Sequence, residues 1–136
     1  MQNLREEKGY TYNIYSAMDA MMLDGYFMIG TEVHKAQREA ALKEIYFEFQ
    51  RLREEKMHEA ELNMVRNYLL GTLLTAVDGA FNIAEVTKTI ILNQLSPSYY
   101  QDLIQTIKTI TAEDVQSVAQ RYLQEDTFYE VIVGWL

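Results

Sequence analysis

The sequence changes its hydrophobic period along the chain, and the order of these periods limits the folds open to it. From residue 10 to residue 33, aromatic and β-branched side chains alternate with others, which is typical of strands. From residue 35 to residue 123, apolar side chains recur every three or four positions, which is typical of helices. Strands gathered at the start and helices after them predict a two-layer α+β domain.

A single glycine separates the first helical residues from the first strand. Residues 4–8 have the pattern of the last turns of a helix, and Gly9 stands where helices commonly end on a left-handed residue. The strand after it alternates, with one face formed by Tyr10, Tyr12 and Ile14 and the other by Thr11, Asn13 and Tyr15. The pattern therefore predicts a helix-to-strand corner, at which Arg5 and Tyr12 lie close enough to face one pocket.

A second strand and a late apolar run complete the predicted sheet. A methionine-rich connection over residues 17–23 leads to the turn dipeptide Asp24-Gly25 and to a strand over residues 25–33. The face of this strand that should meet the core carries Phe27, Ile29, Thr31 and Val33. The C-terminal run Val131-Ile132-Val133 is too apolar for an exposed edge, so we expect it to return to the middle of an antiparallel-dominated sheet of three strands.

Four or five helices follow the strands and should cover the sheet as the second layer. The first spans residues 35–56 and carries the apolar stripe Leu42, Ile45, Phe49 and Leu52. Later helices are predicted to begin near Glu59, after Asp78-Gly79, at Ser96-Pro97 and at Thr111. Ser96 would be an N-cap, with Pro97 as the first helical residue. Gly71 interrupts the second helix, which predicts close packing against another backbone.

Composition excludes several classes of partner. The 136 residues are enough for one domain with one core, and 49% of them are hydrophobic. Twelve basic residues against twenty acidic ones give a formal charge of −8, so a phosphate backbone would be repelled and nucleic acid is not expected as a partner. The chain has no cysteine, which excludes disulfides and thiolate zinc sites and fits either the cytoplasm or the periplasm. We expect a bacterial source. No apolar run approaches the ~18 residues of a membrane span.

The residues of the predicted corner carry a resemblance to a known family. Residues 4–12 read Leu-Arg-Glu-Glu-Lys-Gly-Tyr-Thr-Tyr. This segment resembles the Leu-Arg-Glu-x-x-Gly-x-x-Tyr signature of the C-terminal, non-zinc-binding domain of the pitrilysin/insulinase family of zinc peptidases. Asp24-Gly25 and residues 52–55, 67–71 and 110–115 fall in the usual order of that domain, so the resemblance covers essentially the whole chain.

The resemblance implies a role in peptide hydrolysis without a metal in this chain. In the family, the zinc-binding and zinc-less domains face each other like two half-shells, and the signature arginine and tyrosine reach the peptide held on the metal. Carried over, Arg5 and Tyr12 would bind substrate and stabilise the transition state, because negative charge develops on the attacked carbonyl oxygen. The expected partners are a peptide and a zinc-binding domain of the same polypeptide or of another subunit, and the chain alone should be inert.

The chain lacks the residues for catalysis of its own, and the corner is also compatible with a purely structural role. The family's zinc motif is His-x-x-Glu-His, whereas this chain has only His34 and His58, with Leu62 where a motif beginning at His58 needs its second histidine. No serine or cysteine has the surroundings of a nucleophile. Arginine near a helix C-terminus stabilises the helix, and tyrosine is common in strands. The alternative function is therefore a non-catalytic structural or scaffolding subunit with the same fold.

The resemblance also bears on the completeness of the sheet. The family's domain has a strand and a helix ahead of the arginine-containing turn, and this chain begins almost at that turn. We therefore expect residues 1–136 to be a single partial domain, the later part of a C-terminal domain of this family. An edge that lacks its neighbouring strand presents unpaired N–H and C=O groups. This predicts self-association through strand addition or through an apolar patch around residues 10–15.

Overall fold

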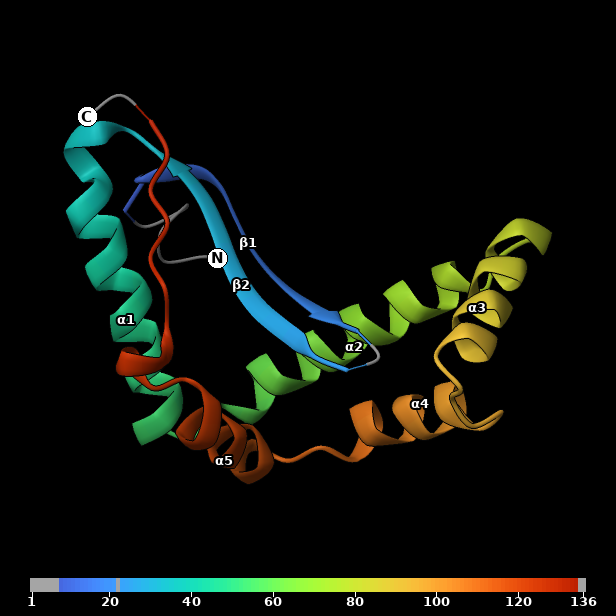
Figure 1. Ribbon diagram of the computed structural model, residues 1–136. Helices are drawn as coiled ribbons and strands as arrows, with labels where there is room; N and C mark the ends of the chain where they lie inside the picture. The colour runs from blue at the N-terminus through green and yellow to red at the C-terminus, as the bar shows by residue number, and fades with distance from the viewer. Residues whose placement is uncertain (1–7, 22, 135–136) are drawn as a thin grey trace.

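The computed structural model of the chain describes residues 8–21 and 23–134, the side chain of Tyr12 excepted (Figure 1). Its two strands are β1 (Thr11–Ala20) and β2 (Gly25–Val33). Its α-helices are α1 (Arg38–Glu54), α2 (Glu59–Ala76), α3 (Ala80–Leu92), α4 (Tyr99–Thr109) and α5 (Ala112–Tyr122). The described residues also form the short 3-10 helices η2 (Lys35–Gln37) and η3 (Glu125–Thr127). The predicted α+β class is confirmed, with one antiparallel sheet and five α-helices.

The two strands form one hairpin. β1 pairs antiparallel with β2 in a register that runs from Ile14 opposite Thr31 to Ala20 opposite Gly25. The turn closes with a hydrogen bond from the Met21 N–H to the Asp24 carbonyl, at 2.8 Å. The prediction of a connection over residues 17–23 was wrong for its first half, because the ladder continues through residues 17–20 and ends only at this turn.

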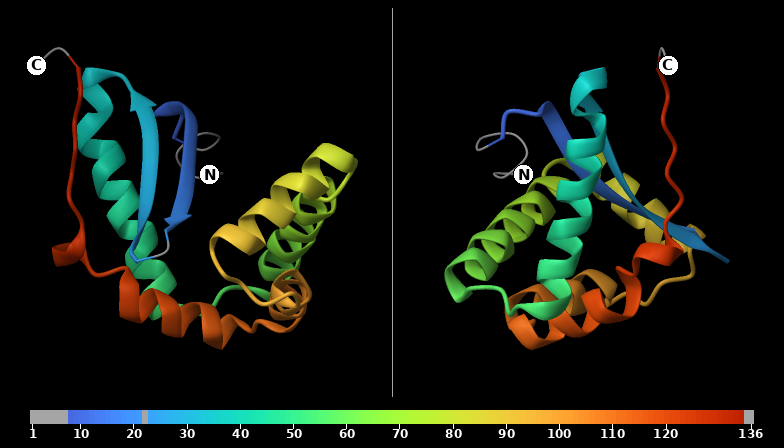
Figure 2. Two further views of the ribbon diagram at one scale, coloured as in Figure 1. Left: turned by 45° about the vertical axis from the view of Figure 1, so that its right-hand side comes forward. Right: turned by 90° about the vertical axis from the view of Figure 1, so that its left-hand side faces the viewer.

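The core lies between the hairpin and α1, which packs along it (Figure 2). Ile14 of β1 and Ala41 of α1 are its buried centre, and the half-buried side chains packed on them are Tyr10, Ile29, Val33 and Ile45. The expected inward face of β2 is confirmed at Ile29 and Val33, but it was wrong for Phe27, which is 42% exposed. Phe49, one helical turn after Ile45 on α1, is also buried, as its place in the apolar stripe predicts.

Helix α5 is held against the C-terminal end of α1 by polar side chains. Arg53 of α1 donates to the Leu123 carbonyl at the end of α5, and the Arg53 carbonyl accepts from the side chains of Gln116 at 3.1 Å and Gln120 at 3.0 Å. The predicted start of α5 at Thr111 is confirmed by a capping box, in which Thr111 and Asp114 exchange hydrogen bonds. The Leu123 carbonyl at the end of α5 and the Asp114 N–H in its first turn thus have hydrogen-bond partners that the helix backbone itself cannot provide.

The helices α2, α3 and α4, which we call the helical arm, extend away from α1 (Figure 2). Leu62 is buried where α2 leaves α1, and the predicted break between α2 and α3 is confirmed at Gly79, whose φ is +86°. No described helix alone is long and apolar enough to span a membrane; α2 and α3 together reach that length and composition, but they are bent by 103°. The close packing predicted at Gly71 was wrong, because a Cβ there would meet nothing within 4 Å.

The C-terminal segment does not form the predicted third strand. Within the described residues, the sheet has two strands, and residues 128–134 run beside α1 instead (Figure 2). The Phe128 ring stacks on Phe49 with centroids 4.9 Å apart and meets the edge of Phe27 at 6.5 Å, and the Tyr46 hydroxyl donates to the Glu130 carboxylate at 2.8 Å. Side-chain contacts with α1 thus replace the backbone ladder that the apolar run led us to expect.

The start of α4 also differs from the prediction. The helix begins at Tyr99, not at Pro97, because residues 96–99 first make a turn in which the Tyr99 N–H donates to the Ser96 carbonyl at 2.9 Å. The Ser96 hydroxyl accepts from the Ser98 N–H at 3.2 Å, so its oxygen serves the turn and not the helix. Ser98 precedes the helix, and its hydroxyl donates to Asp102 in the first turn of α4 at 2.8 Å.

Candidate functional site

Of the two residues predicted to contact substrate, Arg5 and Tyr12, the structure describes only the backbone of Tyr12. Arg5 lies outside the described residues. Tyr12 is the second residue of β1, and its backbone falls between Thr11 and Ile14, where the pairing with β2 is irregular. The proximity of Arg5 to Tyr12 therefore stays a prediction, and what the structure supplies is the backbone frame that carries Tyr12.

The helix predicted over residues 4–8 lies outside the described residues except for Lys8, but the left-handed backbone predicted at Gly9 is confirmed. Gly9 has φ of +62°, in the left-handed region that glycine adopts without a steric cost, and a Cβ there would meet nothing within 4 Å. Glycine is therefore required by the backbone conformation and not by lack of space. On its N-terminal side, the Lys8 ammonium lies 3.9 Å from the Glu44 carboxylate of α1, a partly exposed ion pair of a kind that contributes little to stability.

A bulge follows directly in β1 and changes which side chains share a face. Thr11 and Ile14 are both buried, with 7% and 8% of their surfaces exposed, although a regular strand would place residues three apart on opposite faces. The strict alternation predicted for residues 10–15 was therefore wrong at this point. An extra residue in one strand produces this effect, and such bulges often redirect side chains near functional sites. Tyr12 lies inside the bulge.

A small hydroxyl network holds the bulge in place. The Thr11 Oγ1 lies 2.7 Å from the Asn13 carbonyl and 2.8 Å from the Glu32 carbonyl, and it accepts from the Asn13 N–H at 3.1 Å. From β2, the Thr31 hydroxyl lies 2.8 Å from Thr11 Oγ1 and 3.0 Å from the Asn13 carbonyl. The residues before and after Tyr12 are thus tied to each other and to the neighbouring strand.

The other tyrosines of β1 and its approach have structural contacts. Tyr10, two residues before Tyr12, packs half-buried against the core formed by Ile14 and Ala41. Tyr15 pairs with Gly30 across the hairpin, and a Cβ built on Gly30 would lie 2.5 Å from the Tyr15 Cζ. The Tyr15 ring therefore fills the space that a side chain at residue 30 would need.

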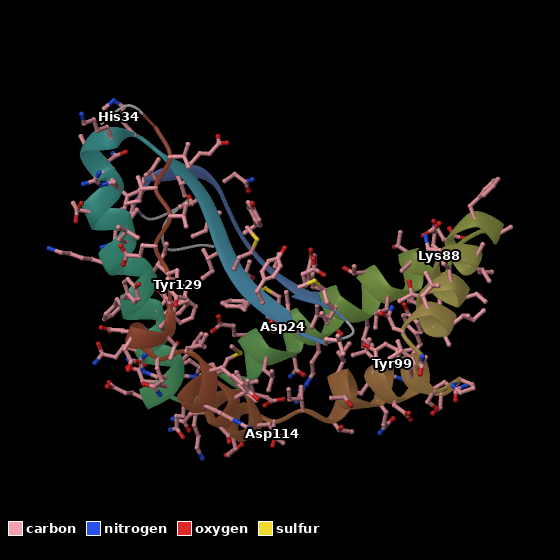
Figure 3. All side chains as sticks on the ribbon, in the orientation of Figure 1. Asp24, His34, Lys88, Tyr99, Asp114 and Tyr129 are labelled. Atoms are coloured by element: carbon pink, nitrogen blue, oxygen red, sulfur yellow. The ribbon has the colours of Figure 1, made fainter. Side chains whose placement is uncertain are left out.

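The two histidines do not form a site together. His34 precedes η2, where its Nδ1 accepts from the Ala36 N–H at 3.3 Å, and Figure 3 shows it at the opposite end of α1 from Asp114. His58 precedes α2 beyond the other end of α1, a helix of 17 residues that spans about 25 Å. Within residues 8–21 and 23–134, no group of three or more His, Cys, Asp or Glu side chains could hold a metal ion.

Among the residues that the structure describes, three titratable groups have shifted pKa values, and all three belong to contacts that hold one element to another or cap a helix. The hydrogen bond to Glu130 raises the pKa of the Tyr46 phenol, and burial and the Glu130 charge add to it. The hydrogen bond from Lys56 lowers the pKa of Glu113. The side-chain and backbone hydrogen bonds from Thr111 lower the pKa of Asp114. These shifts report the anchoring of the C-terminal segment and of α5, not a reacting group.

Sequence reasoning missed the hydroxyl network around Tyr12. A threonine on each of two predicted neighbouring strands, with an asparagine two residues after the first, was a signal for side-chain to backbone hydrogen bonds. Its meaning depended on the cross-strand register, which places Thr11 near Thr31. That register becomes visible only in the folded hairpin.

Comparison with known families gives a match over the first half of the chain. Residues 1–69 match the family described as peptidase M16 inactive domain. This segment contains the corner, the hairpin, α1 and part of α2. No curated protein matches the sequence at a significant level.

Two solved structures share the fold over most of the chain. One is a peptidase M16 inactive domain from Pseudomonas fluorescens, which has 25% sequence identity and a TM-score of 0.76, with 91% of this chain and 29% of that chain covered. The other is a protease from Helicobacter pylori, with 17% identity and a TM-score of 0.75, covering 91% of this chain and 30% of that one. The chain thus spans about three tenths of the length of each solved structure.

Proposed function

The chain belongs to the family of peptidase M16 inactive domains, and from this premise we propose that it supplies the substrate-binding half of a zinc-dependent peptidase. Its 136 residues would form the later part of the zinc-less domain. The partner would be a His-x-x-Glu-His domain, on the same polypeptide or on another subunit. The described residues offer no ligand set for the metal, so the proposal gives this chain no zinc of its own and no activity when alone.

The observation that carries the proposal is the corner around Gly9. The signature arginine, glycine and tyrosine keep their spacing as Arg5, Gly9 and Tyr12. Gly9 has the left-handed backbone that was predicted for it, and Tyr12 lies in a bulge whose two sides are held by hydrogen bonds of Thr11. A rigid backbone on either side of a donor is what a preorganised contact needs, because no free energy is then lost in ordering it during the reaction.

The chemistry proposed for the two side chains follows from their hydrogen-bond donors. A peptide carbonyl oxygen gains negative charge when the amide carbon is attacked, and the Tyr12 phenol can donate one hydrogen bond to that oxygen. The Arg5 guanidinium is proposed as the second donor, and its fixed positive charge would favour the same developing anion. Both contacts strengthen in the transition state, so they should act on turnover more than on substrate affinity.

The test is Tyr12→Phe in the enzyme reconstituted with its zinc-binding domain. Loss of one such donor should lower kcat on the order of 10–1000-fold, with a smaller change in KM. Tyr10→Phe is the matched control, because it removes a phenol oxygen two residues away, from a ring that packs on the core. Equal kcat for the wild type and Tyr12→Phe would remove Tyr12 from the mechanism.

The competing function is a structural or scaffolding subunit that binds a catalytic partner without touching substrate. A scaffolding subunit would have the same fold and belong to the same family as a substrate-binding one. The two proposed functions therefore differ only in whether the side chains of the corner, Arg5 and Tyr12, act on substrate. In a scaffold, Tyr12→Phe and Arg5→Lys would leave the activity of the assembled complex unchanged. The parent sequence offers a second discriminator, because a His-x-x-Glu-His motif in the same or an adjacent reading frame favours the peptidase.

A further inference from the structure

Strand β1 leaves one edge of the hairpin open. Within the described residues the sheet has two strands, so β1 has a strand neighbour only on the side of β2. Along an antiparallel ladder, residues that bond to the partner strand alternate with residues whose backbone groups point away from it. Apart from this ladder, the backbone of residues 14–20 makes no hydrogen bond in the described part of the chain. The N–H and C=O groups that point away from β2 can therefore pair with another strand.

The open edge is accessible and leads to Tyr12. From Tyr15 to Ala20 every residue of β1 is exposed, whereas Ile14 is buried in the core. Ile14 is two residues from Tyr12, which is about 7 Å along an extended strand. A chain that lies along the edge of β1 would thus lead directly to the corner for which substrate contacts are proposed.

The hairpin carries charge of one sign only. Residues 9–33 contain Asp19, Asp24 and Glu32 but no lysine, arginine or histidine. Asp19 lies within β1, where its carboxylate is 3.4 Å from the Tyr26 hydroxyl and pairs with no basic side chain among the described residues. Opposite charges on neighbouring strands attract and like charges repel. A strand that adds to this edge therefore gains from basic side chains.

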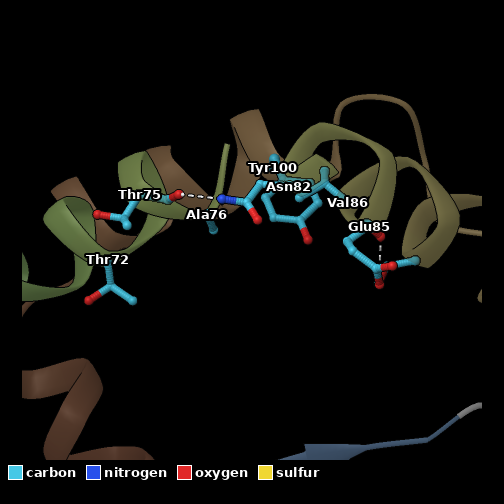
Figure 4. A pocket seen from close by; sticks show the side chains of 8 residues that line it. Thr72, Thr75, Ala76, Asn82, Glu85, Val86 and Tyr100 are labelled. Atoms are coloured by element: carbon cyan, nitrogen blue, oxygen red, sulfur yellow. Dashed lines mark hydrogen bonds between the residues drawn. The ribbon is translucent and has the colours of Figure 1, made fainter. Parts of the chain in front are cut away.

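The helical arm offers no comparable place for a peptide backbone. Its helices bond their own N–H and C=O groups, and the hollow between α2, α3 and α4 is lined by hydroxyls that do the same (Figure 4). The hydroxyls of Thr75 and Thr89 donate to the carbonyls four residues earlier, at 3.1 and 2.9 Å. Glu85, the carboxylate in the described lining, already pairs with Lys88. A free backbone and an unpaired charge thus occur together at β1 and not in this hollow.

We propose that the free edge of β1 binds an extended peptide with basic side chains, which adds as a strand beside residues 14–20. Its backbone bonds to the outward N–H and C=O groups, and its basic side chains lie on the face that Tyr15 and Asp19 share. A second copy of this chain fits the edge less well, because its hairpin brings acidic residues and no basic one. That the peptide is a substrate rests on the proposed function, whereas the preference for a basic strand rests on β1 alone.

The experiment measures binding of three short peptides to the full chain by isothermal titration calorimetry. Acetyl-Lys-Val-Lys-Val-Lys-Val-amide places its lysines on one face of a strand, and acetyl-Glu-Val-Glu-Val-Glu-Val-amide is its acidic counterpart. The third is the lysine peptide with N-methyl groups on its two central residues, which removes one N–H from each edge of the strand. The lysine peptide should bind saturably and about tenfold more tightly than either of the others. Equal binding of the lysine peptide and either of the others would overturn the proposal.

Hydrogen exchange locates the bound peptide. Amides within residues 14–20 should exchange several-fold more slowly with the lysine peptide bound, because the added strand gives their N–H groups acceptors. Amides of α3 are the internal reference and should not change. Equal protection of both segments, or none at β1, would overturn the proposal. So would protection of residues 14–20 that rises with protein concentration and is not displaced by the peptide, because a second copy would then occupy the edge.

One substitution tests the charge on β1. Asp19→Asn should weaken binding of the lysine peptide about two- to fivefold, the range for loss of one cross-strand charge pair. The matched control is Asp126→Asn, which removes the same group from an exposed residue of η3, outside the hairpin. An affinity unchanged by Asp19→Asn, or weakened as much by Asp126→Asn, would show that only the net charge of the chain attracts the peptide and would overturn the choice of this edge.

The inference and the proposed function fail separately. If Tyr12→Phe leaves kcat unchanged while the lysine peptide protects β1, the edge holds a peptide partner and the catalytic role proposed for Tyr12 fails. If Tyr12→Phe lowers kcat while the lysine peptide does not protect β1, the proposed function is kept and the strand addition fails.

Discussion

Two glycines of this chain differ in whether the backbone requires glycine at their position. Gly9 has φ of +62°, a backbone that a residue with a Cβ adopts only with strain, whereas Gly71 lies inside α2 with open space around it. The first is therefore required for the corner ahead of β1, and the second only weakens its helix. The same substitution should consequently act in opposite directions at the two positions.

We expect Gly9→Ala to lower the free energy of unfolding by about 1–2 kcal/mol, because the left-handed backbone then carries a Cβ. Gly71→Ala is the matched control and should raise it by about 0.5–1 kcal/mol, because alanine is the better helix former and has room. Urea unfolding of the three proteins measures both effects. A loss of stability in Gly71→Ala equal to that in Gly9→Ala would contradict the assignment.

A second residue-scale prediction concerns the cap of α5. The hydrogen bonds from Thr111 hold the pKa of Asp114 below its ordinary value of 3.8. A lowered folded pKa means that the stabilisation is complete above the ordinary value and disappears as the pH falls through the lower folded value. Asp114→Asn should therefore be less stable than the wild type from about pH 6 down to about pH 4, and the difference should close toward about pH 2.

Urea unfolding across this pH range checks the cap prediction. Glu61→Gln, which removes one exposed acidic side chain near the start of α2, is a suitable control for net charge. A stability difference between the wild type and Asp114→Asn that does not depend on pH would show that the carboxylate charge is not what caps the helix.

At the scale of elements, α1 holds together parts that are distant in the sequence. It packs on the hairpin through Ala41 and Ile45, on α5 through Arg53, and on the C-terminal segment through Tyr46 and Phe49. The C-terminal segment depends on these contacts most, because within the described residues it forms no strand of the sheet. Its attachment can therefore be tested without disturbing the hairpin.

We expect Phe128→Ala to free residues 128–134 from α1. The ring stacks on Phe49 and meets Phe27, so its loss removes the main apolar anchor of the segment. Limited proteolysis should then cut this segment several-fold faster, because cleavage follows the population of the open form. Tyr129→Ala is the control, since that neighbouring side chain is 97% exposed. Equal acceleration in the two variants would mean that Phe128 is no anchor.

The elements differ in how far the sequence alone predicts them. β2, α1 and α5 follow from local information, since period and capping residues such as Thr111 lie within each element. The bulge at Thr11 and the position of the C-terminal segment depend on partners, such as Thr31 and Phe49, that are far away in the sequence. The apolar run over residues 131–133 suggested a strand, but the run alone could not show what the segment would lie against.

The same distinction applies to the candidate site. The helical pattern that ends at Gly9 and the strand pattern after it predicted the corner, and Gly9 has the left-handed backbone expected of a glycine at a helix end. The hydroxyl network that fixes the strand around Tyr12 was invisible, because it needs the register between β1 and β2.

The whole molecule exposes more surface than a compact protein of its size. Its accessible area is 10848 Å² for 15.9 kDa, whereas a compact monomer of that mass exposes about 7,400 Å². Large apolar side chains contribute to this surface, among them Met18 and Leu23 of the hairpin and Tyr68 and Phe81 of the helical arm, which are 72–95% exposed. A surface of this kind is typical of a part that is covered by other protein.

We therefore expect the chain to self-associate when it is alone in solution. Within the described residues, β1 has a strand neighbour on one side only, and its other edge can pair with a second copy. Sedimentation at micromolar concentration should show a mass that rises with concentration, and Tyr15→Lys should reduce it, because an edge lysine opposes strand addition.

The control for the self-association prediction distinguishes the sheet edge from the helical arm. Tyr68→Lys makes the same change on α2, where the side chain is 72% exposed. If Tyr68→Lys reduces association and Tyr15→Lys does not, the arm is the surface involved. A stable monomer at all concentrations would contradict association through the edge of β1 and association through the helical arm alike.

The sparse burial of the helical arm has a consequence for how the molecule opens in time. Among the described residues, α3 and α4 contain no buried side chain and α2 contains only Leu62, whereas the core around Ile14 and Ala41 holds the hairpin to α1. Segments with few buried contacts unfold locally at a lower free energy than the rest of a protein. Backbone amides of the arm would thus exchange with heavy water through brief separate openings, while those of the hairpin would wait for the whole chain to unfold.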